Sequence, residues 1–114
     1  MDDLIAEITS KNGLGRPIVE KALGIIMSFL ESEGPAGKVT SLIDRLPGAR
    51  QLADANPSQA GGVFAVFGEL SAAGLGMGEI QAIAAAFVAF AKAKLGDREV
   101  DAVIRAIPGV GQFI

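Results

Sequence analysis

The stretch GLGRPIVEKALGIIMSFL, residues 13–30, decides the fold of this chain. After Pro17, which suits the first turn of a helix, apolar residues recur at spacings of three and four, the period of a helix face. They form two neighbouring stripes, so the apolar face is wide and the helix is expected to lie at the centre of the fold. The stripes comprise Ile18, Val19, Ala22, Leu23, Ile25, Ile26, Phe29 and Leu30.

The stretch GLGMGEIQAIAAAFVAFA, residues 74–91, repeats this segment 61 positions later. Without a gap, ten of the 53 aligned pairs are identical, and loop residues match as well as core positions. We therefore interpret residues 1–53 and 62–114 as two copies of one unit, joined by residues 54–61. Convergent helix–loop–helix patterning is the alternative. The identical pairs are Ser10/Ser71, Gly13/Gly74, Leu14/Leu75, Gly15/Gly76, Phe29/Phe90, Val39/Val100, Ile43/Ile104, Pro47/Pro108, Gly48/Gly109 and Gln51/Gln112.

Each unit is predicted to hold three helices. In the first unit they cover residues 2–11, the central stretch from Pro17, and residues 39–46, where Pro47-Gly48 ends the third helix. A short helical tail over 49–53 is expected to follow. In the second unit, Asn56-Pro57 resembles a helix start, and Asp97 is expected to cap the last helix.

No stretch of the sequence shows the alternation of apolar and polar residues that is typical of a β-strand, so the chain is predicted to be all-α. It is expected to form a single domain over residues 1–114. A three-helix unit of about 50 residues is marginally stable alone. We therefore expect two tandem units, with about six main helices, to pack as one bundle around a pseudo-twofold axis. The second central helix is apolar nearly all round and is expected to be buried on most sides.

Composition limits the chemistry. Half of the 114 residues are hydrophobic, and the chain has no Cys, His, Trp or Tyr. Disulfides, thiolate or imidazole metal ligands, and Cys or His nucleophiles and bases are thereby excluded. No cofactor, metal site or catalytic residue is predicted, and we expect the protein not to be an enzyme, although a Ser–Lys pair stays open.

Charge and targeting signals point away from nucleic acids and membranes. The formal net charge is −3, and the cations are scattered, whereas nucleic-acid affinity needs clustered Lys and Arg. The longest uncharged apolar run, Ala82–Ala91, is far shorter than the roughly 20 residues of a membrane span. Asp2 and Asp3 stand where a signal peptide would carry basic residues. A soluble, cytoplasmic protein without a leader is expected.

Two motifs resemble ligand-binding loops. Gly74, Gly76 and Gly78 suggest a phosphate loop, but no strand pattern precedes them, and a helix cap with a tight turn explains them better. Asp97, Glu99 and Asp101 have the spacing of a calcium loop's first ligands. The glycine that such a loop requires is replaced by alanine, so acids in a helix's first turn are the favoured interpretation.

The phenylalanines give the candidate binding residues. They fall mostly on helical apolar stripes, which favours a role in the core. The alternative is an apolar cavity lined by Phe64, Phe67, Phe87 and Phe90. Large apolar residues at the end of the sequence, Phe113-Ile114, are expected to dock on the core or on a partner. If one chain cannot bury both central helices, a homodimer is expected to bury them.

Two resemblances add to this. Residues 4–30 resemble the opening helix pair of the histone-like bacterial DNA-bending proteins, but no strand pattern, basic β-arm or intercalating proline tip follows, so DNA bending is not expected. Nearly the whole chain resembles small bacterial families of unknown function built from duplicated helical units, in which a Gly-Leu turn precedes an apolar helix and a later helix ends in Pro-Gly. That resemblance implies a fold and no activity. It rests on Gly13-Leu14, Ala22, Phe29, Pro47-Gly48, Gly74-Leu75, Phe90 and Pro108-Gly109.

These observations leave two functions open. The first is a non-enzymatic structural or protein-interaction module that self-associates or binds another helical protein. The second is a binder of an apolar or lipid-like small molecule between the two helical units.

Overall fold

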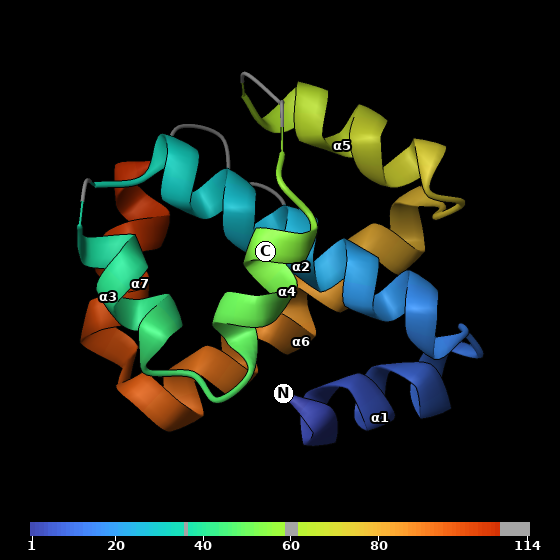
Figure 1. Ribbon diagram of the computed structural model, residues 1–114, viewed down its shortest axis with the longest axis horizontal. Helices are drawn as coiled ribbons and strands as arrows, with labels where there is room; N and C mark the ends of the chain where they lie inside the picture. The colour runs from blue at the N-terminus through green and yellow to red at the C-terminus, as the bar shows by residue number, and fades with distance from the viewer. Residues whose placement is uncertain (36, 59–61, 108–114) are drawn as a thin grey trace.

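The computed structural model describes residues 1–35, 37–58 and 62–107, and every regular element in them is an α-helix. The prediction of an all-α fold is confirmed (Figure 1). Seven helices lie within these residues, one more than the six main helices expected, because the predicted tail after the third helix forms a full helix. They are α1 (Asp2–Asn12), α2 (Arg16–Glu33), α3 (Lys38–Asp44), α4 (Ala49–Ala55), α5 (Val63–Ala72), α6 (Met77–Leu95) and α7 (Asp97–Ala106).

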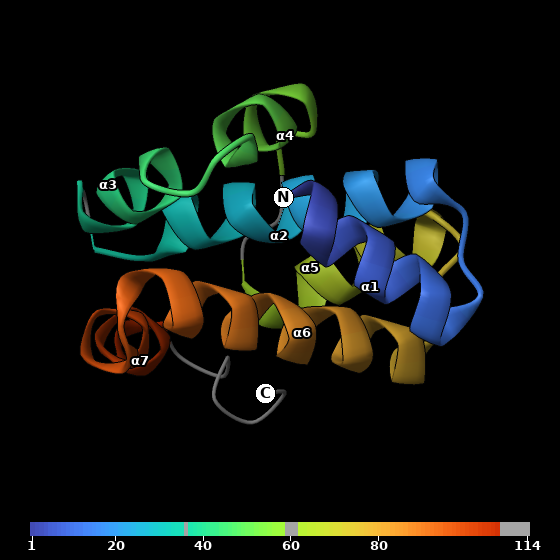
Figure 2. The ribbon, with the colours of Figure 1, turned by 90° about the horizontal axis from the view of Figure 1, so that it is seen from below.

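The two long helices α2 and α6 lie side by side at the centre (Figure 2). Helix α1 packs on both of them from one side, and α5 packs on both from the opposite side (Figure 1). Helix α4 covers the side of α2 that faces away from α6, while α3 packs on α2 and α7 packs on α6. The central position predicted for residues 13–30 is therefore confirmed.

Glycines set the turn into α2. Gly13 ends α1 with a left-handed backbone (φ 66°), and its N–H donates to the Thr9 carbonyl at 3.0 Å. A left-handed residue after the last turn is a common way to satisfy a helix's terminal carbonyls. Gly15 is then the N-cap of α2, and Pro17 lies in its first turn, where a missing N–H costs nothing.

The core is entirely apolar. Within the described residues no polar or charged side chain is buried. Helix α2 supplies its centre, since Val19, Ala22, Leu23 and Met27 have no exposed surface. Burial of a side chain such as Val19, Leu23 or Met27 is worth about 1.5–3 kcal/mol, so hydrophobic packing between α2 and its neighbours is the main stabilising term.

Helix bounds recur at the spacing of the sequence repeat. Helix α2 begins at Arg16 and α6 at Met77, and the difference, 77 − 16, is 61 residues. Helices α1 and α5 begin at residues 2 and 63, again 61 apart. Helix α7 begins at Asp97, within two residues of the position 61 after the start of α3. The positions that correspond to α4 are 110 onwards, outside the described residues.

Asn56-Pro57 does not begin a helix, and this prediction is wrong. Asn56 is instead the C-cap of α4, and its Nδ2 donates to the Leu52 carbonyl at 3.0 Å. The side chain therefore satisfies the end of the preceding helix. The following helix, α5, begins only at Val63, after Gly62.

Two other predicted helix ends lie elsewhere. Helix α3 stops at Asp44, before Pro47, because the Arg45 and Leu46 N–H groups donate to carbonyls three residues back and tighten the turn. Gly96, with φ 98°, joins α6 to α7 and is the N-cap of α7, the role expected for Asp97.

Arg50 links three elements of the first half. Its guanidinium donates to both oxygens of Glu31 on α2, at 3.1 and 2.7 Å, and also to Asp44 and Asp54. The Arg50 hydrogen bonds, with one from Thr40, hold the pKa of Glu31 below its usual value of 4.5. Paired, forked hydrogen bonds of this kind fix geometry as well as charge, so the network holds α4 in register on α2.

This network predicts an acid-dependent loss of stability. A carboxylate whose pKa is lower in the folded state contributes stability above its unfolded pKa, and that stability is lost as pH falls through the folded value. We expect Glu31→Gln to cost about 1 kcal/mol at pH 7 and to flatten the decline in unfolding free energy below pH 4.5. Urea unfolding between pH 7 and 3 measures both effects, with Gln51→Ala on α4 as the neutral control. An unchanged acid decline in Glu31→Gln would contradict the prediction.

Candidate ligand cavity

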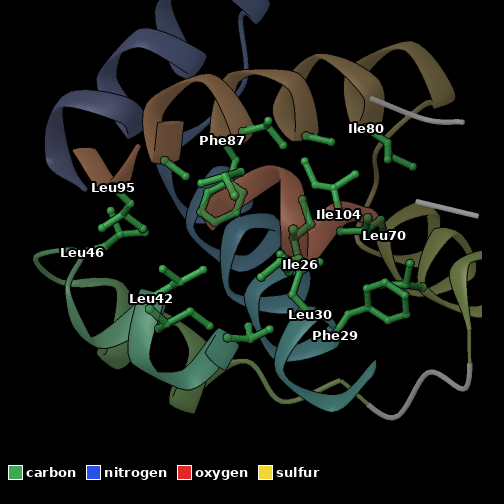
Figure 3. Close-up of a pocket in the computed structure, with 18 of the residues that line it drawn as sticks. Ile26, Phe29, Leu30, Leu42, Leu46, Leu70, Ile80, Phe87, Leu95 and Ile104 are labelled. Atoms are coloured by element: carbon green, nitrogen blue, oxygen red, sulfur yellow. The ribbon is translucent and has the colours of Figure 1, made fainter. Parts of the chain in front are cut away.

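An apolar cavity of about 100 Å³ lies between α2 and α3 on one side and α6 and α7 on the other, with α5 closing one end (Figure 3). Every residue that lines it is apolar. No side chain in this lining offers water a hydrogen-bond partner. The lining residues are Ile26, Phe29, Leu30, Val39, Leu42, Ile43, Leu46, Val66, Phe67, Leu70, Ile80, Ala84, Phe87, Val88, Ala91, Leu95, Val100, Val103 and Ile104.

The structure brings together two of the four phenylalanines proposed for such a cavity. Phe67 from α5 and Phe87 from α6 line it. Phe29 from α2, which the helical stripes of the sequence predict to lie in the core, joins them (Figure 3). The aliphatic residues of α3 and α7 complete the wall, and only their helical spacing marked them in the sequence.

Phe64 and Phe90 do not line the cavity. Phe64 lies on the outer side of α5 with 83% of its surface exposed. Phe90 is half-buried, and the Lys94 Nζ lies 5.7 Å from the centroid of its ring, within the range of a cation–π contact. Phe113 and Ile114 lie outside the described residues.

The two loop-like motifs take structural roles. Gly74, with φ 103°, lies in the turn after α5, and the Gly76 N–H at the start of α6 donates to the Glu79 carboxylate at 2.8 Å. Of the acidic trio on α7, Glu99 pairs with Arg45 and Asp101 pairs with Lys92. Within the part of the chain that the structure describes, no three His, Cys, Asp or Glu side chains gather as a metal site would require.

No single helix among the described residues has the length and apolar character needed to cross a membrane. Taken together, Phe64–Ala72 and Met77–Leu95 are long and apolar enough to cross a membrane, but the two helices are bent by 110° at the break between them. Helices α5 and α6 nevertheless contribute Val66, Leu70, Ile80 and Ile83 to the core. Their apolar character therefore has an explanation within the fold, and a cytoplasmic location stays a prediction.

Comparison of the chain with protein-family models, curated proteins and solved structures finds no match. The resemblance to families of duplicated helical units therefore stays a prediction.

Proposed function

We propose that this protein is a non-enzymatic helical module that binds a small apolar molecule between its two halves. The observation that carries the proposal is the cavity between α2–α3 and α6–α7, whose lining has no polar side chain. Binding sites for small molecules are concave and mostly apolar. A dry apolar cavity of roughly 150 Å³ accepts benzene, so one of about 100 Å³ suits a ligand of benzene size or smaller. An acyl chain would need the helices to move.

The site is proposed to lie between two related units. In support, α1 packs on α2 and α6, and α5, its counterpart in the repeat, packs on α6 and α2. Exchange of the two units leaves this set of contacts unchanged, as a pseudo-twofold axis between α2 and α6 requires. Matching positions also share burial: Val19 and Ile80 are buried, as are Ala22 and Ile83. A cavity beside such an axis receives walls from both units.

Filling the cavity tests the proposal. Ala84 lines it from α6, and Ala84→Leu places three further carbon atoms in the space. We expect benzene to shift the methyl resonances of Ile26 and Leu30 in the original protein and to raise its melting temperature, since ligand binding to the folded state alone stabilises it. In Ala84→Leu, affinity for benzene should fall at least about tenfold, because the leucine side chain occupies the space that the ligand needs; a tenfold change corresponds to about 1.4 kcal/mol.

The matched control is Ala93→Leu, an exposed position on the same helix, which should bind benzene as the original protein does. Equal benzene affinity in Ala84→Leu, or no shift of the cavity methyl groups in benzene-saturated buffer, would contradict ligand binding in this cavity.

Self-association is the second candidate function, and the outer face of α5 favours it. Phe64 on α5, with 83% of its surface exposed, is a large apolar residue on this face, and Met77 at the start of α6 is 56% exposed. Helix α5 has one charged residue, Glu69, which is half-buried and accepts a hydrogen bond from Ser58 at 2.6 Å. The exposed face is therefore uncharged. Aromatic residues on such faces are often the anchors of an interface, and a second copy would supply the same face by symmetry.

For this candidate, Phe64→Ser is expected to weaken dimerisation at least about tenfold, because anchor residues dominate interface energies. Sedimentation velocity over a concentration series measures the effect, with Ala65→Ser on the same helix as control. A protein that is monomeric at all concentrations, or a dimer that Phe64→Ser leaves unchanged, would contradict self-association through α5.

A further inference from the structure

We propose that a ligand enters the cavity between α3 and α7, and that the ion pair of Arg45 with Glu99 is a latch that closes this route. The inference rests on the proposed ligand binding, because it names the path to that same cavity and the contact that controls it. It is independent of self-association through α5.

The Arg45–Glu99 pair joins the two halves of the chain. The Arg45 guanidinium donates to the Glu99 carboxylate at 2.6 Å, although the two residues are 54 positions apart in the sequence. Arg45 follows the last turn of α3, and Glu99 lies in the first turn of α7. Of the ion pairs among residues 1–35, 37–58 and 62–107, no other links residues 1–53 to residues 62–107. Polar attachment of α3 to α7 therefore depends on this pair.

Each of these two helices also has an ion pair within its own half. On α3, Asp44 pairs with Arg50 of α4 at 2.9 Å. On α7, Asp101 pairs with Lys92 of α6 at 3.1 Å. Separation of α3 from α7 leaves both of these pairs intact. The line between the two helices, the α3–α7 seam, is therefore the place where the halves can part while each helix keeps its own support.

The cavity lies directly beneath this seam. The residues that α3 buries, Val39, Leu42 and Ile43, all line the cavity. Helix α7 adds Val100 and Val103, the two residues that it buries. Figures 1 and 2 show α3 and α7 side by side. Separation of the two helices would thus connect the cavity with solvent without unfolding either of them.

The two ends of the seam are closed by different contacts. At one end, Ile107 is 3% exposed, and an added Cβ at Gly34 would lie 3.4 Å from its Cδ1. At the other end, the side chains of Arg45 and Glu99 are 48% and 45% exposed. Buried apolar contacts are costly to separate, whereas a half-exposed ion pair contributes little to stability. The seam is therefore expected to open at the Arg45–Glu99 end.

That end leads straight into the cavity. Leu46, which follows Arg45, is 3% exposed and lines the cavity, as does Leu95, four residues before Glu99. Figure 3 shows Leu46 and Leu95 at one end of the cavity and Leu70 of α5 toward the other. An opening beside the ion pair therefore gives access to the cavity at the end away from α5.

The other walls of the cavity are continuous helices. Helices α2 and α6 run without a break for 18 and 19 residues. The expectation that α6 is buried on most sides is not met, since Gln81, Ala85 and Ala89 are exposed. These three residues do not line the cavity, however. Helix α5 closes the far end with Val66 and Leu70, which are both buried.

Charge exchange across the latch tests the proposal in the full chain, which has no cysteine of its own. Val103→Cys reports opening, because Val103 is 5% exposed, lines the cavity and lies one turn after Glu99 on the same face of α7. Arg45→Glu places two carboxylates opposite each other, so maleimide labelling of the Val103→Cys thiol should accelerate at least about threefold. Addition of Glu99→Arg restores opposite charges and should return the rate to within about twofold of the original.

Two controls separate the latch from general effects. Lys38→Glu makes the same change of charge at an exposed position of α3 and should leave the labelling rate unchanged. A thiol at Val19→Cys, fully buried on α2 and outside the cavity lining, reports global unfolding, and its labelling should be equal with and without Arg45→Glu. Unchanged labelling of Val103→Cys in Arg45→Glu, or no recovery in the double exchange, would overturn the latch.

Benzene exchange connects the seam to the ligand. In Arg45→Glu, exchange of benzene between the free and bound states, followed by broadening of the Leu46 methyl resonances, should accelerate at least about threefold. Affinity should change by less than about twofold, because the latch alters passage in both directions and not the bound state. Accelerated labelling with unchanged benzene exchange would overturn entry through the seam. Absence of benzene binding in every variant would contradict the proposed function itself, and with it the entry route, while labelling still reports whether the seam opens.

Discussion

Gly24→Val is expected to lower the free energy of unfolding by at least about 3 kcal/mol, the upper range for overpacking in a close-packed core. A Cβ at this position would lie 2.3 Å from the Leu52 carbonyl oxygen, 2.5 Å from the Asn56 Nδ2 and 2.7 Å from the Asn56 Cβ. The Leu52 backbone cannot move away from the added Cβ unless the whole of α4 moves. Because α4 is held on α2 by the Ser28 and Glu31 contacts as well, its displacement breaks these too.

Gly68→Ala is the matched control. Gly68 also lies inside a helix, α5, but an added Cβ there would meet nothing within 4 Å. Alanine is preferred over glycine in helices by about 0.8–1.0 kcal/mol, so this variant should be more stable than the original. Urea unfolding of both variants separates helix preference from packing. Equal stability of Gly24→Val and the original protein would mean that α4 does not contact α2 in this way.

Ile83→Ala is expected to cost about 2–5 kcal/mol, the range for truncating a large buried aliphatic side chain. Ile83 has no exposed surface and lies in the main core cluster. Helix α6 is rich in alanine, and few large side chains hold it in place, so the loss of one is not easily compensated. A typical domain has only about 5–15 kcal/mol of net stability, and a substantial fraction of the variant should be unfolded in mild denaturant.

Gln81→Ala, an exposed position on the same helix, is the control and should change stability by no more than about 0.5 kcal/mol. Thermal and urea unfolding measure both variants. A cost below about 1 kcal/mol for Ile83→Ala would indicate that α6 is not packed through this face.

Only part of the candidate site could be predicted from the sequence. Of the four phenylalanines that the sequence suggested for a cavity, Phe67 and Phe87 line it, whereas Phe64 is exposed and Phe90 packs at the edge of the core. Helix periodicity identifies the buried residues of a helix well when the opposite face of that helix is polar. Helices α5 and α6 are apolar nearly all round, so the period does not say which of their apolar residues faces the centre. That choice depends on where α2 and α7 lie.

The sequence by itself determined the helical class and most helix positions. Gly13, Gly15 and Pro17 mark the turn into α2, and the starts of α1 and α5, and of α2 and α6, are 61 residues apart. These are local effects of backbone freedom, capping and side-chain period, which act within a few residues and are readable without a fold.

Only the tertiary structure decided which surfaces meet. The approach of α4 to Gly24, the link from Arg50 to Glu31, and the cavity between α2 and α6 join residues far apart in the sequence. Asn56 shows the same limit locally, since its side chain is equally suited to begin a helix or to end one. Packing selects among such alternatives because burial energy depends on the partner surface, which no single segment contains.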